Sequence, residues 1–250
     1  MATSYLQLNI QQKQAILVAF QSGEECRSIP KLLGVSGRSV AKVLSEFGVN
    51  TKCRNRYTLN EGYFDEIDTP IESYLLGLMA ADGCVTDKNY IVLESIDREL
   101  VDLFAREIEF SGEIREIDRS PHKPHFRINF SSQRLAKALH QWQIVTDRIA
   151  TDSYRFPSAE YLNAYVLGYF DGDGCAYRNK GRSGGLVCIV GSNNFTQELS
   201  ELMKMGVTII HSHKVVYYWR VFSRTNIQKF YDLMYRYPDL GLVRKKEKIE

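Results

Sequence analysis

The sequence predicts an α+β fold: two similar αββαββα units preceded by a small all-α domain. Two closely similar segments, YLLGLMAADGCV (74–85) and YVLGYFDGDGCA (165–176), lie 91 residues apart. The same order of helical and strand-like patterns follows each segment. Residues 1–50 have a different pattern of short helical segments. Because a repeated α+β unit buries its apolar faces most simply against its own copy, the two repeats are expected to pair within one chain.

The segments that follow each motif define the repeats. The first has alternating strand patterns at 90–96 and 124–130 and helical patterns at 97–110 and 131–142. The second has the same types at 185–191, 214–222, 193–204 and 225–237. In the 124–130 segment, apolar Phe126, Ile128 and Phe130 alternate with polar His125, Arg127 and Asn129, as in a half-exposed strand. We expect a first repeat at 71–157 and a second at 158–250, after a linker at 51–70, with Pro70 opening the first motif helix.

Residues 1–50 predict a helix-turn-helix DNA-binding domain. A helical segment at 11–23 ends at a glycine, and a short helix, a Gly-Val-Ser turn and a second helix follow. A three-helix bundle with only a packing role is the alternative. The inward residues are expected to be Val40, Val43, Leu44 and Phe47, and the exposed ones Ser36, Arg38, Ser39 and Lys42.

Composition favours a soluble intracellular protein. The chain is 44% hydrophobic and 25% charged, and it has neither a signal-peptide pattern nor an apolar run long enough to cross a membrane. Its five scattered cysteines predict neither disulfides nor a zinc ribbon. The net charge is +5 over residues 1–60, −10 over 61–110, +2 over 111–164 and +5 over 165–250. Basic ends suit a polyanion, although a solvated charged surface would look the same.

Small residues recur along one face of each motif helix, and an acid stands at its end. Gly77 and Ala81, like Gly168 and Gly172, are four residues apart, which allows two helix backbones to approach closely. Glycine costs about 1 kcal/mol relative to alanine inside a helix, so a tight helix contact would compensate for it.

Asp82 and Asp173 would then end side by side, each followed by a glycine (Gly83, Gly174) that we expect in the left-handed conformation. Each carboxylate opposes the negative end of its helix dipole and faces the other carboxylate. A hard cation such as Mg²⁺ would remove both unfavourable interactions. Two acidic turns without metal are the alternative.

At these residues the chain resembles the LAGLIDADG homing endonucleases. LLGLMAADG and VLGYFDGDG resemble the family's nonapeptide, and the resemblance extends from about residue 71 to the basic tail LGLVRKKEK. It implies that antiparallel sheets form a saddle over the DNA major groove and that Asp82 and Asp173 hold the catalytic metal. The other motif acid is Asp171 in the second copy but Ala80 in the first, which indicates a locally asymmetric site. No metal-binding role is assigned to position 81, an alanine.

The resemblance implies site-specific hydrolysis of one phosphodiester in each strand of double-stranded DNA. Mg²⁺ is the expected cofactor, and Mn²⁺ or Ca²⁺ could replace it for binding. Polar residues where strands lead into helices are further catalytic candidates, foremost Gln133 and Arg224, with Glu94, Ser95 and Arg134 beside them. No motif fixes these positions, and each could be a helix cap or a surface group.

Other features are assigned less specific roles. Histidines 122, 125, 211 and 213 are expected at loops or strand edges that face nucleic acid rather than on zinc, and Cys84 and Cys175 as small buried residues. A non-cleaving DNA-binding regulator or an RNA-splicing maturase on the same scaffold is the alternative function. An intein is disfavoured because the chain starts with Met and ends in KEKIE. Since the halves present different residues (His125, Arg127 and Asn129 against Lys214, Tyr218 and Arg220), we expect a monomer on a long asymmetric site.

Overall fold

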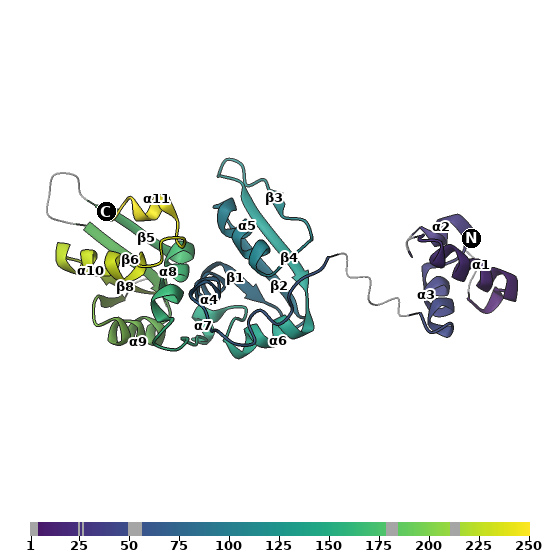
Figure 1. The fold of residues 1–250 in the computed structure, drawn as a ribbon, viewed down its shortest axis with the longest axis horizontal. Coiled ribbons are helices and arrows are strands. Elements are labelled where there is room, and N and C mark those ends of the chain that lie inside the picture. Colours follow the sequence, from purple (N-terminus) through teal and green to yellow (C-terminus); the bar gives the residue numbers. More distant parts are fainter. Residues whose placement is uncertain (1–4, 25, 27, 50–56, 179–184, 211–215) are drawn as a thin grey trace. The chain divides into compact units, whose positions relative to one another are not determined.

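Figure 1 shows the chain as a computed structural model, which describes residues 5–24, 26, 28–49, 57–178, 185–210 and 216–250. The chain divides into two compact units, Met1–Tyr57 and Thr58–Glu250. In the described residues, no helix has both the length and the apolar character needed to cross a membrane.

The first unit is a small group of helices. A short 3-10 helix η1 (Tyr5–Gln7) precedes α1 (Ile10–Gln21), α2 (Ile29–Leu33) and α3 (Gly37–Glu46). The Ser36 side chain accepts a hydrogen bond from the backbone N–H of Ser39 and so caps α3. Gly34 ends α2 with a φ of 66°, a left-handed conformation that glycine adopts without a steric penalty. Helix α2, a glycine turn and α3 therefore follow one another as the sequence pattern indicates.

Two side chains of α3 differ from expectation. Val40, Val43 and Leu44 are buried in the core of this unit, but Phe47 is 48% exposed because it follows the last turn of the helix. Ser39, which was expected to be exposed, is buried and its hydroxyl is 2.7 Å from that of Ser36. Arg38 and Lys42 are exposed, as expected.

The second unit has the predicted αββαββα order twice. The first repeat contains α4 (Pro70–Asp82), β1 (Gly83–Val85), β2 (Tyr90–Ser95), α5 (Arg98–Glu107), β3 (Arg115–Ile117), β4 (His125–Ser131) and α6 (Gln133–Gln141). The second contains α8 (Leu162–Asp173), β5 (Gly174–Arg178), β6 (Gly185–Gly191), α9 (Asn193–Met203), β7 (Val207–Ile210), β8 (Tyr217–Val221) and α10 (Arg224–Met234). A short helix that the sequence patterns did not predict comes after the last of these helices in each repeat: α7 (Arg148–Thr151) after α6 and α11 (Val243–Lys246) after α10.

Each repeat forms an open, four-stranded antiparallel sheet. The strand orders are β1-β2-β4-β3 and β5-β6-β8-β7, so the topology is the same in both. The alternation expected for β4 is confirmed where Ile128 and Phe130 are buried and Asn129 is exposed. The helices pack against the apolar face of each sheet, which leaves the other face accessible. Two open sheets of this kind are consistent with a saddle-shaped surface.

The segment before α4 departs from the expected linker at 51–70. Residues 50–56 lie outside the described part of the chain. From Thr58 onward the segment belongs to the second unit: Phe64 is fully buried and its ring stacks on that of Phe104, with centroids 6.2 Å apart. The Trp142 indole N–H donates to the Phe64 carbonyl oxygen at 3.0 Å. Most residues of this segment are polar or charged, so the sequence pattern does not indicate that Phe64 is buried and anchors it.

Candidate metal centre between the motif helices

The two motif helices α4 and α8 pack directly on each other at the centre of the second unit (Figure 1). A Cβ built on Gly77 would lie 2.0 Å from the Tyr165 carbonyl oxygen, and one built on Gly168 would lie 1.9 Å from the Tyr74 carbonyl oxygen. The contact is reciprocal, because each glycine meets the residue equivalent to the one that its own helix presents. Only glycine permits this approach, so the predicted close helix contact is confirmed.

Asp82 and Asp173 are the last residues of α4 and α8. A Cβ on Gly172 would lie 3.2 Å from the Asp82 carboxyl carbon, so this side chain rests against the last turn of the opposite helix. The glycines that follow are not left-handed, contrary to expectation: Gly83 and Gly174 have φ values of −98° and −91° and lead straight into β1 and β5. Glycine is needed there because a Cβ would collide with Met79 in the first repeat and with Phe170 in the second.

The electrostatics of the two carboxylates reflect their closeness. Burial, and then repulsion from Asp173, raise the pKa of Asp82 to about 7. Burial also raises the pKa of Asp173, against the attraction of Arg148 and Lys245. In the absence of a bound cation, the pair is therefore costly to ionise.

Two basic residues bind the ends of the motif helices: Lys245, which lies in the basic tail, and Arg148, which no sequence motif marks. Arg148, the first residue of α7, donates to the carbonyl oxygens of Ala81 (2.8 Å) and Gly83 at the end of α4. Lys245 of α11 donates to the carbonyl oxygens of Phe170, Asp171 and Gly174, at 2.6, 2.8 and 2.7 Å, at the end of α8. Each cation offsets the negative end of a helix dipole beside a carboxylate.

The two cations differ in environment. The Arg148 side chain lines an open cleft of about 470 Å³ that also contains Asp173 and Cys84. Lys245 is only 4% exposed, and burial lowers its pKa to about 8 although Asp171 and Asp82 act in the opposite direction. Lys245 of the basic tail and Arg148 after α6 therefore occupy equivalent positions, each at the C-terminal end of a motif helix.

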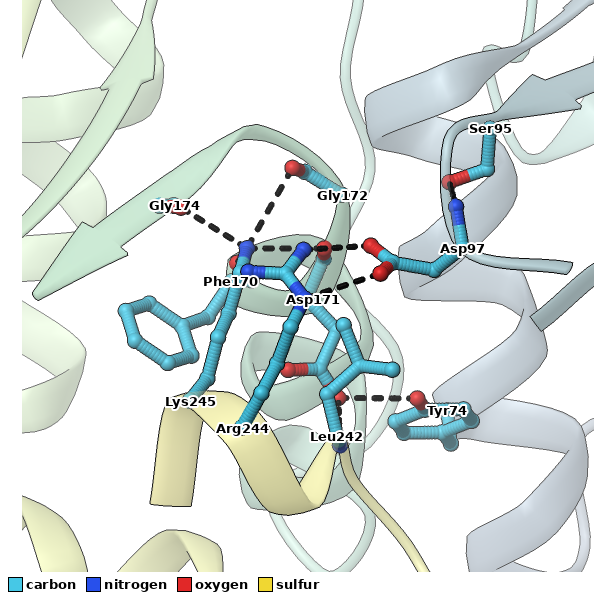
Figure 2. A network of polar contacts seen from close by, with 10 residues as sticks. All are labelled: Tyr74, Ser95, Asp97, Phe170, Asp171, Gly172, Gly174, Leu242, Arg244 and Lys245. Carbon is cyan, nitrogen blue, oxygen red and sulfur yellow. Dashed lines mark hydrogen bonds and ion pairs between the residues drawn. The ribbon is translucent and has the colours of Figure 1, made fainter. Parts of the chain in front are cut away.

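Asp171 occupies a position that has no acidic counterpart in the first repeat. One of its carboxylate oxygens accepts hydrogen bonds from the Tyr74 hydroxyl (2.8 Å) and from the backbone N–H of Leu242 (2.9 Å), as Figure 2 shows. Burial raises the pKa of this carboxyl to about 6. The equivalent residue, Ala80, is buried without a polar group. Asp171 thus ties the C-terminal segment and the first motif helix to α8, and the site is locally asymmetric.

Of the further site candidates, Ser95 is the one that the described residues place beside an aspartate. It is buried, and its hydroxyl lowers the pKa of the Asp82 carboxyl. Glu94 accepts hydrogen bonds from Arg119, His125 and Arg127. Burial alone would raise the pKa of Glu94, but these three partners hold it below its ordinary value.

Gln133 and Arg224 lie at the other end of their sheets. Gly83, next to Asp82, pairs with Leu93, whereas Ser131 at the end of β4 pairs with Tyr90. The start of α6 is therefore separated from Asp82 by most of the length of β2, roughly 10 Å at about 3.4 Å per residue. Arg224 comes three residues after Val221, which pairs with Val187, two residues along β6 from Ile189, the partner of Gly174. Both side chains are exposed, and Arg134 pairs with Asp65 instead.

The two cysteines that follow the motif glycines are less buried than expected. Cys175 is exposed and Cys84 half-buried, so neither is the buried residue that was expected. The cysteines at 26, 84, 175 and 188 are free thiols. His211, His213 and Lys214 lie outside the described residues.

Part of this chain matches a known family of domains, and its fold is similar to that of solved structures. Residues 160–235 match the model of the LAGLIDADG-like domain. The crystal structure of the I-LtrWI LAGLIDADG homing endonuclease bound to target DNA is similar, with a TM-score of 0.53 and 12% identity over 76% of this chain and 89% of that one. The LAGLIDADG meganuclease I-AabMI bound to uncleaved DNA gives a TM-score of 0.49 and 14% identity, over 73% and 88% of the two chains. A search of curated protein sequences finds no match.

The match to the LAGLIDADG-like domain thus lies in the second repeat, and the fold of the chain is similar to that of the I-LtrWI LAGLIDADG homing endonuclease.

We expect the metal-free protein to lose stability as the pH rises from about 4 to about 7. The folded-state pKa of Asp82 (about 7) lies above its ordinary value of 3.8, so in this interval the folded state holds a proton that the unfolded state releases. About three pKa units correspond to at most about 4 kcal/mol. Urea unfolding in EDTA at pH 5 and pH 8 measures the difference.

Asp82→Asn should reduce that pH dependence, and Asp102→Asn, at an exposed position of α5, should leave it unchanged. An undiminished loss of stability in Asp82→Asn would contradict the expectation.

Proposed function

We propose that this chain is a site-specific endonuclease that hydrolyses one phosphodiester in each strand of double-stranded DNA, with Mg²⁺ held by Asp82 and Asp173. One observation carries the proposal: two carboxylates, Asp82 half-buried and Asp173 open to the cleft, end adjacent helices between two open sheets. Paired carboxylates of this kind are stable as anions only when a cation shares the site.

The residues present fit a divalent cation that is shared with DNA. Within the described ranges, no group of three or more His, Cys, Asp or Glu residues could hold a metal by itself. Mg²⁺ is commonly bound by one or two carboxylates, with phosphate oxygens and water completing the coordination. When bound, the metal supplies activation of water and stabilisation of charge on the phosphate and the leaving oxygen.

The chain's own residues hold and orient the reacting groups. Asp82 lies beside the Ser95 hydroxyl and rests against Gly172 of the opposite helix. Arg148 and Lys245 fix the helix ends that carry the aspartates. Because Arg148 also lines the open cleft beside Asp173, its guanidinium can stabilise negative charge on a bound phosphate.

The accessible sheet faces are suited to DNA and differ between the halves. On the first, His125 and Arg127 surround Glu94, with Asn129 exposed beyond them. On the second, Arg220 lies over the Tyr218 ring, 5.0 Å from its centroid. Unlike surfaces suit unlike half-sites, which supports a monomer on an asymmetric target.

The test is cleavage of DNA from around the insertion site of the gene, or from a random-sequence library, with Mg²⁺ and with EDTA. Metal-dependent double-strand breaks at one site, by a protein that light scattering shows to be monomeric, are expected. Binding without cleavage would favour a regulator. Metal-independent binding of RNA in preference to DNA would favour a maturase.

The N-terminal unit is proposed to lengthen the DNA contact. Arg38 and Lys42 are exposed on α3, which follows the glycine turn at Gly34. We expect the double variant Arg38→Ala, Lys42→Ala to bind target DNA more weakly and to lower the slope of log affinity against log salt by roughly 2, because about one counterion is released for each phosphate contact. Fluorescence anisotropy at several salt concentrations measures both quantities.

Lys31→Ala, at an exposed position of α2, is the matched control and should lower the slope less. Equal slopes for the double variant and the unchanged protein would mean that α3 does not contact DNA.

A further inference from the structure

The short helix α11 contacts both repeats through neighbouring residues. Lys245 binds the end of α8 in the second repeat, as described above. The adjacent Arg244 reaches the first repeat, where its guanidinium donates two hydrogen bonds to the Asp97 carboxylate, one of them at 2.8 Å (Figure 2). Leu242, immediately before α11, is held by Asp171. The segment is therefore anchored at three points around the carboxylate pair.

Asp97 departs from the usual behaviour of an aspartate at a helix start. It is the N-cap residue of α5, a position where an aspartate normally accepts a hydrogen bond from its own helix. No such side-chain bond is made, and the carboxylate binds Arg244 instead. Asp97 therefore lacks the usual cap hydrogen bond and instead contacts a residue 147 positions away in the sequence, which indicates a role beyond capping.

The contact continues to a catalytic carboxylate. The Asp97 backbone N–H donates to the Ser95 hydroxyl oxygen at 3.3 Å, and the Ser95 hydroxyl lies near enough to Asp82 to lower the pKa of its carboxyl. Arg244 in the second repeat is thereby linked, by one ion pair and one hydrogen bond, to Ser95 beside Asp82 in the first. The Asp97 side chain is 14% exposed and the Arg244 side chain 41%, so the ion pair lies at the edge of the site and is partly screened by solvent.

The opposite half has a related contact of different chemistry. Asp152, which follows α7, accepts hydrogen bonds from the side chains of Ser192 and Asn194. Ser192 is the N-cap residue of α9, as Asp97 is of α5. Each repeat thus holds the start of the other repeat's second helix, but the contact to α5 alone is bidentate and made between two charges.

We propose that Arg244 is a positioning residue that orients Asp82 through Asp97 and Ser95, so that the tail of the second repeat completes the metal site of the first. This inference rests on the proposed function. It makes hydrolysis of one strand depend on Arg244 more than hydrolysis of the other. An outer partner of a metal ligand typically changes metal affinity or activity about 10- to 100-fold.

The experiment measures both strands separately, on a DNA duplex with a different label on each. Arg244→Ala should slow cleavage of one strand roughly 10- to 100-fold, so that nicked DNA accumulates, and should raise the Mg²⁺ concentration for half-maximal rate. Asp97→Asn, which keeps the shape of the side chain, should slow the same strand. Arg244→Lys should restore part of the rate, since lysine keeps the charge but not the bidentate geometry.

A second readout needs neither metal nor cleavage. Hydrogen exchange of the metal-free, DNA-free protein should show loss of protection at the Ser95–Asp97 amides in Arg244→Ala. Arg106→Ala, which removes an exposed ion pair at the far end of α5, is the matched control and should change neither readout.

Equal cleavage of both strands at the unchanged rate, or unchanged protection at the Ser95–Asp97 amides, would overturn the proposal. If the unaltered protein cleaves no DNA with any divalent metal, the proposed function fails, and the exchange measurement still decides whether Arg244 orders Asp97 and Ser95.

Discussion

Asp82→Asn and Asp173→Asn should each abolish double-strand cleavage while DNA affinity stays within a few-fold of the original value. Each substitution replaces one carboxylate of the pair with a neutral amide of the same size, at the end of α4 or of α8. An outer partner of a metal ligand contributes about 10- to 100-fold, so the loss of a direct ligand should cost at least about 100-fold. Affinity survives because the sheet faces that would contact DNA are not altered.

The two variants should also differ from each other. Asp82 is more enclosed than Asp173 and has the Ser95 hydroxyl beside it, so the two halves need not fail equally. One variant should retain slow nicking of a single strand. Plasmid cleavage assays separate nicked from linear products, and anisotropy with Ca²⁺ measures binding alone. Asp102→Asn is the control. Full double-strand cutting by either variant would refute the metal-site assignment.

Gly168→Ala should be the most damaging single methyl group that can be added to this protein. The new Cβ would lie 1.9 Å from the Tyr74 carbonyl oxygen and 3.0 Å from the Leu78 nitrogen, both backbone atoms that no side-chain rotation can move. The better helix propensity of alanine returns about 1 kcal/mol. Separating the helices should cost about 3 kcal/mol or more, and the unfolding temperature should fall by roughly 5 °C or more.

The same separation should impair catalysis. A displacement of about 1 Å between reacting groups can lower a rate roughly 100-fold. We therefore expect Gly168→Ala to cleave far more slowly than its remaining folded fraction accounts for. Calorimetry and single-turnover cleavage test the two parts of this expectation.

Gly37→Ala is the matched control for Gly168→Ala, because it also adds a methyl group to a helix. Its Cβ would meet only Pro30, at 3.9 Å, so stability should stay unchanged or rise slightly. Equal effects of the two substitutions would mean that the close helix contact is not what requires glycine.

The order of elements in both repeats could be predicted from the sequence because each element carries its own local signal. Strand β4 alternates apolar and polar residues, and Pro70 opens α4 in the expected position. The helix pairing could be predicted as well, since a glycine inside a helix lowers its stability unless a second backbone packs closely against it. These are properties of neighbouring residues in one chain segment.

The surroundings of the aspartates could not be predicted, because they depend on residues distant in sequence. Arg148 and Lys245 follow the last helices of their repeats, 66 and 72 residues after the aspartates that they serve. Gln133 and Arg224 each follow a strand and begin a helix. Strand register determines at which end of the sheet such a residue lies, and a short sequence pattern does not reveal the register.

The contact between α4 and α8 has a consequence for how such a chain can change. Gly77 and Gly168 contact backbone carbonyls, so these contacts do not depend on particular side chains of the opposite helix. The interface between α4 and α8 would therefore accept a repeat taken from a different ancestor, provided that both glycines are kept. The pairs Tyr74 with Asp171 and Asp97 with Arg244 are specific to their partners. A functional chimaera would therefore have to inherit both members of each pair, whereas the sheet faces could diverge freely toward new targets.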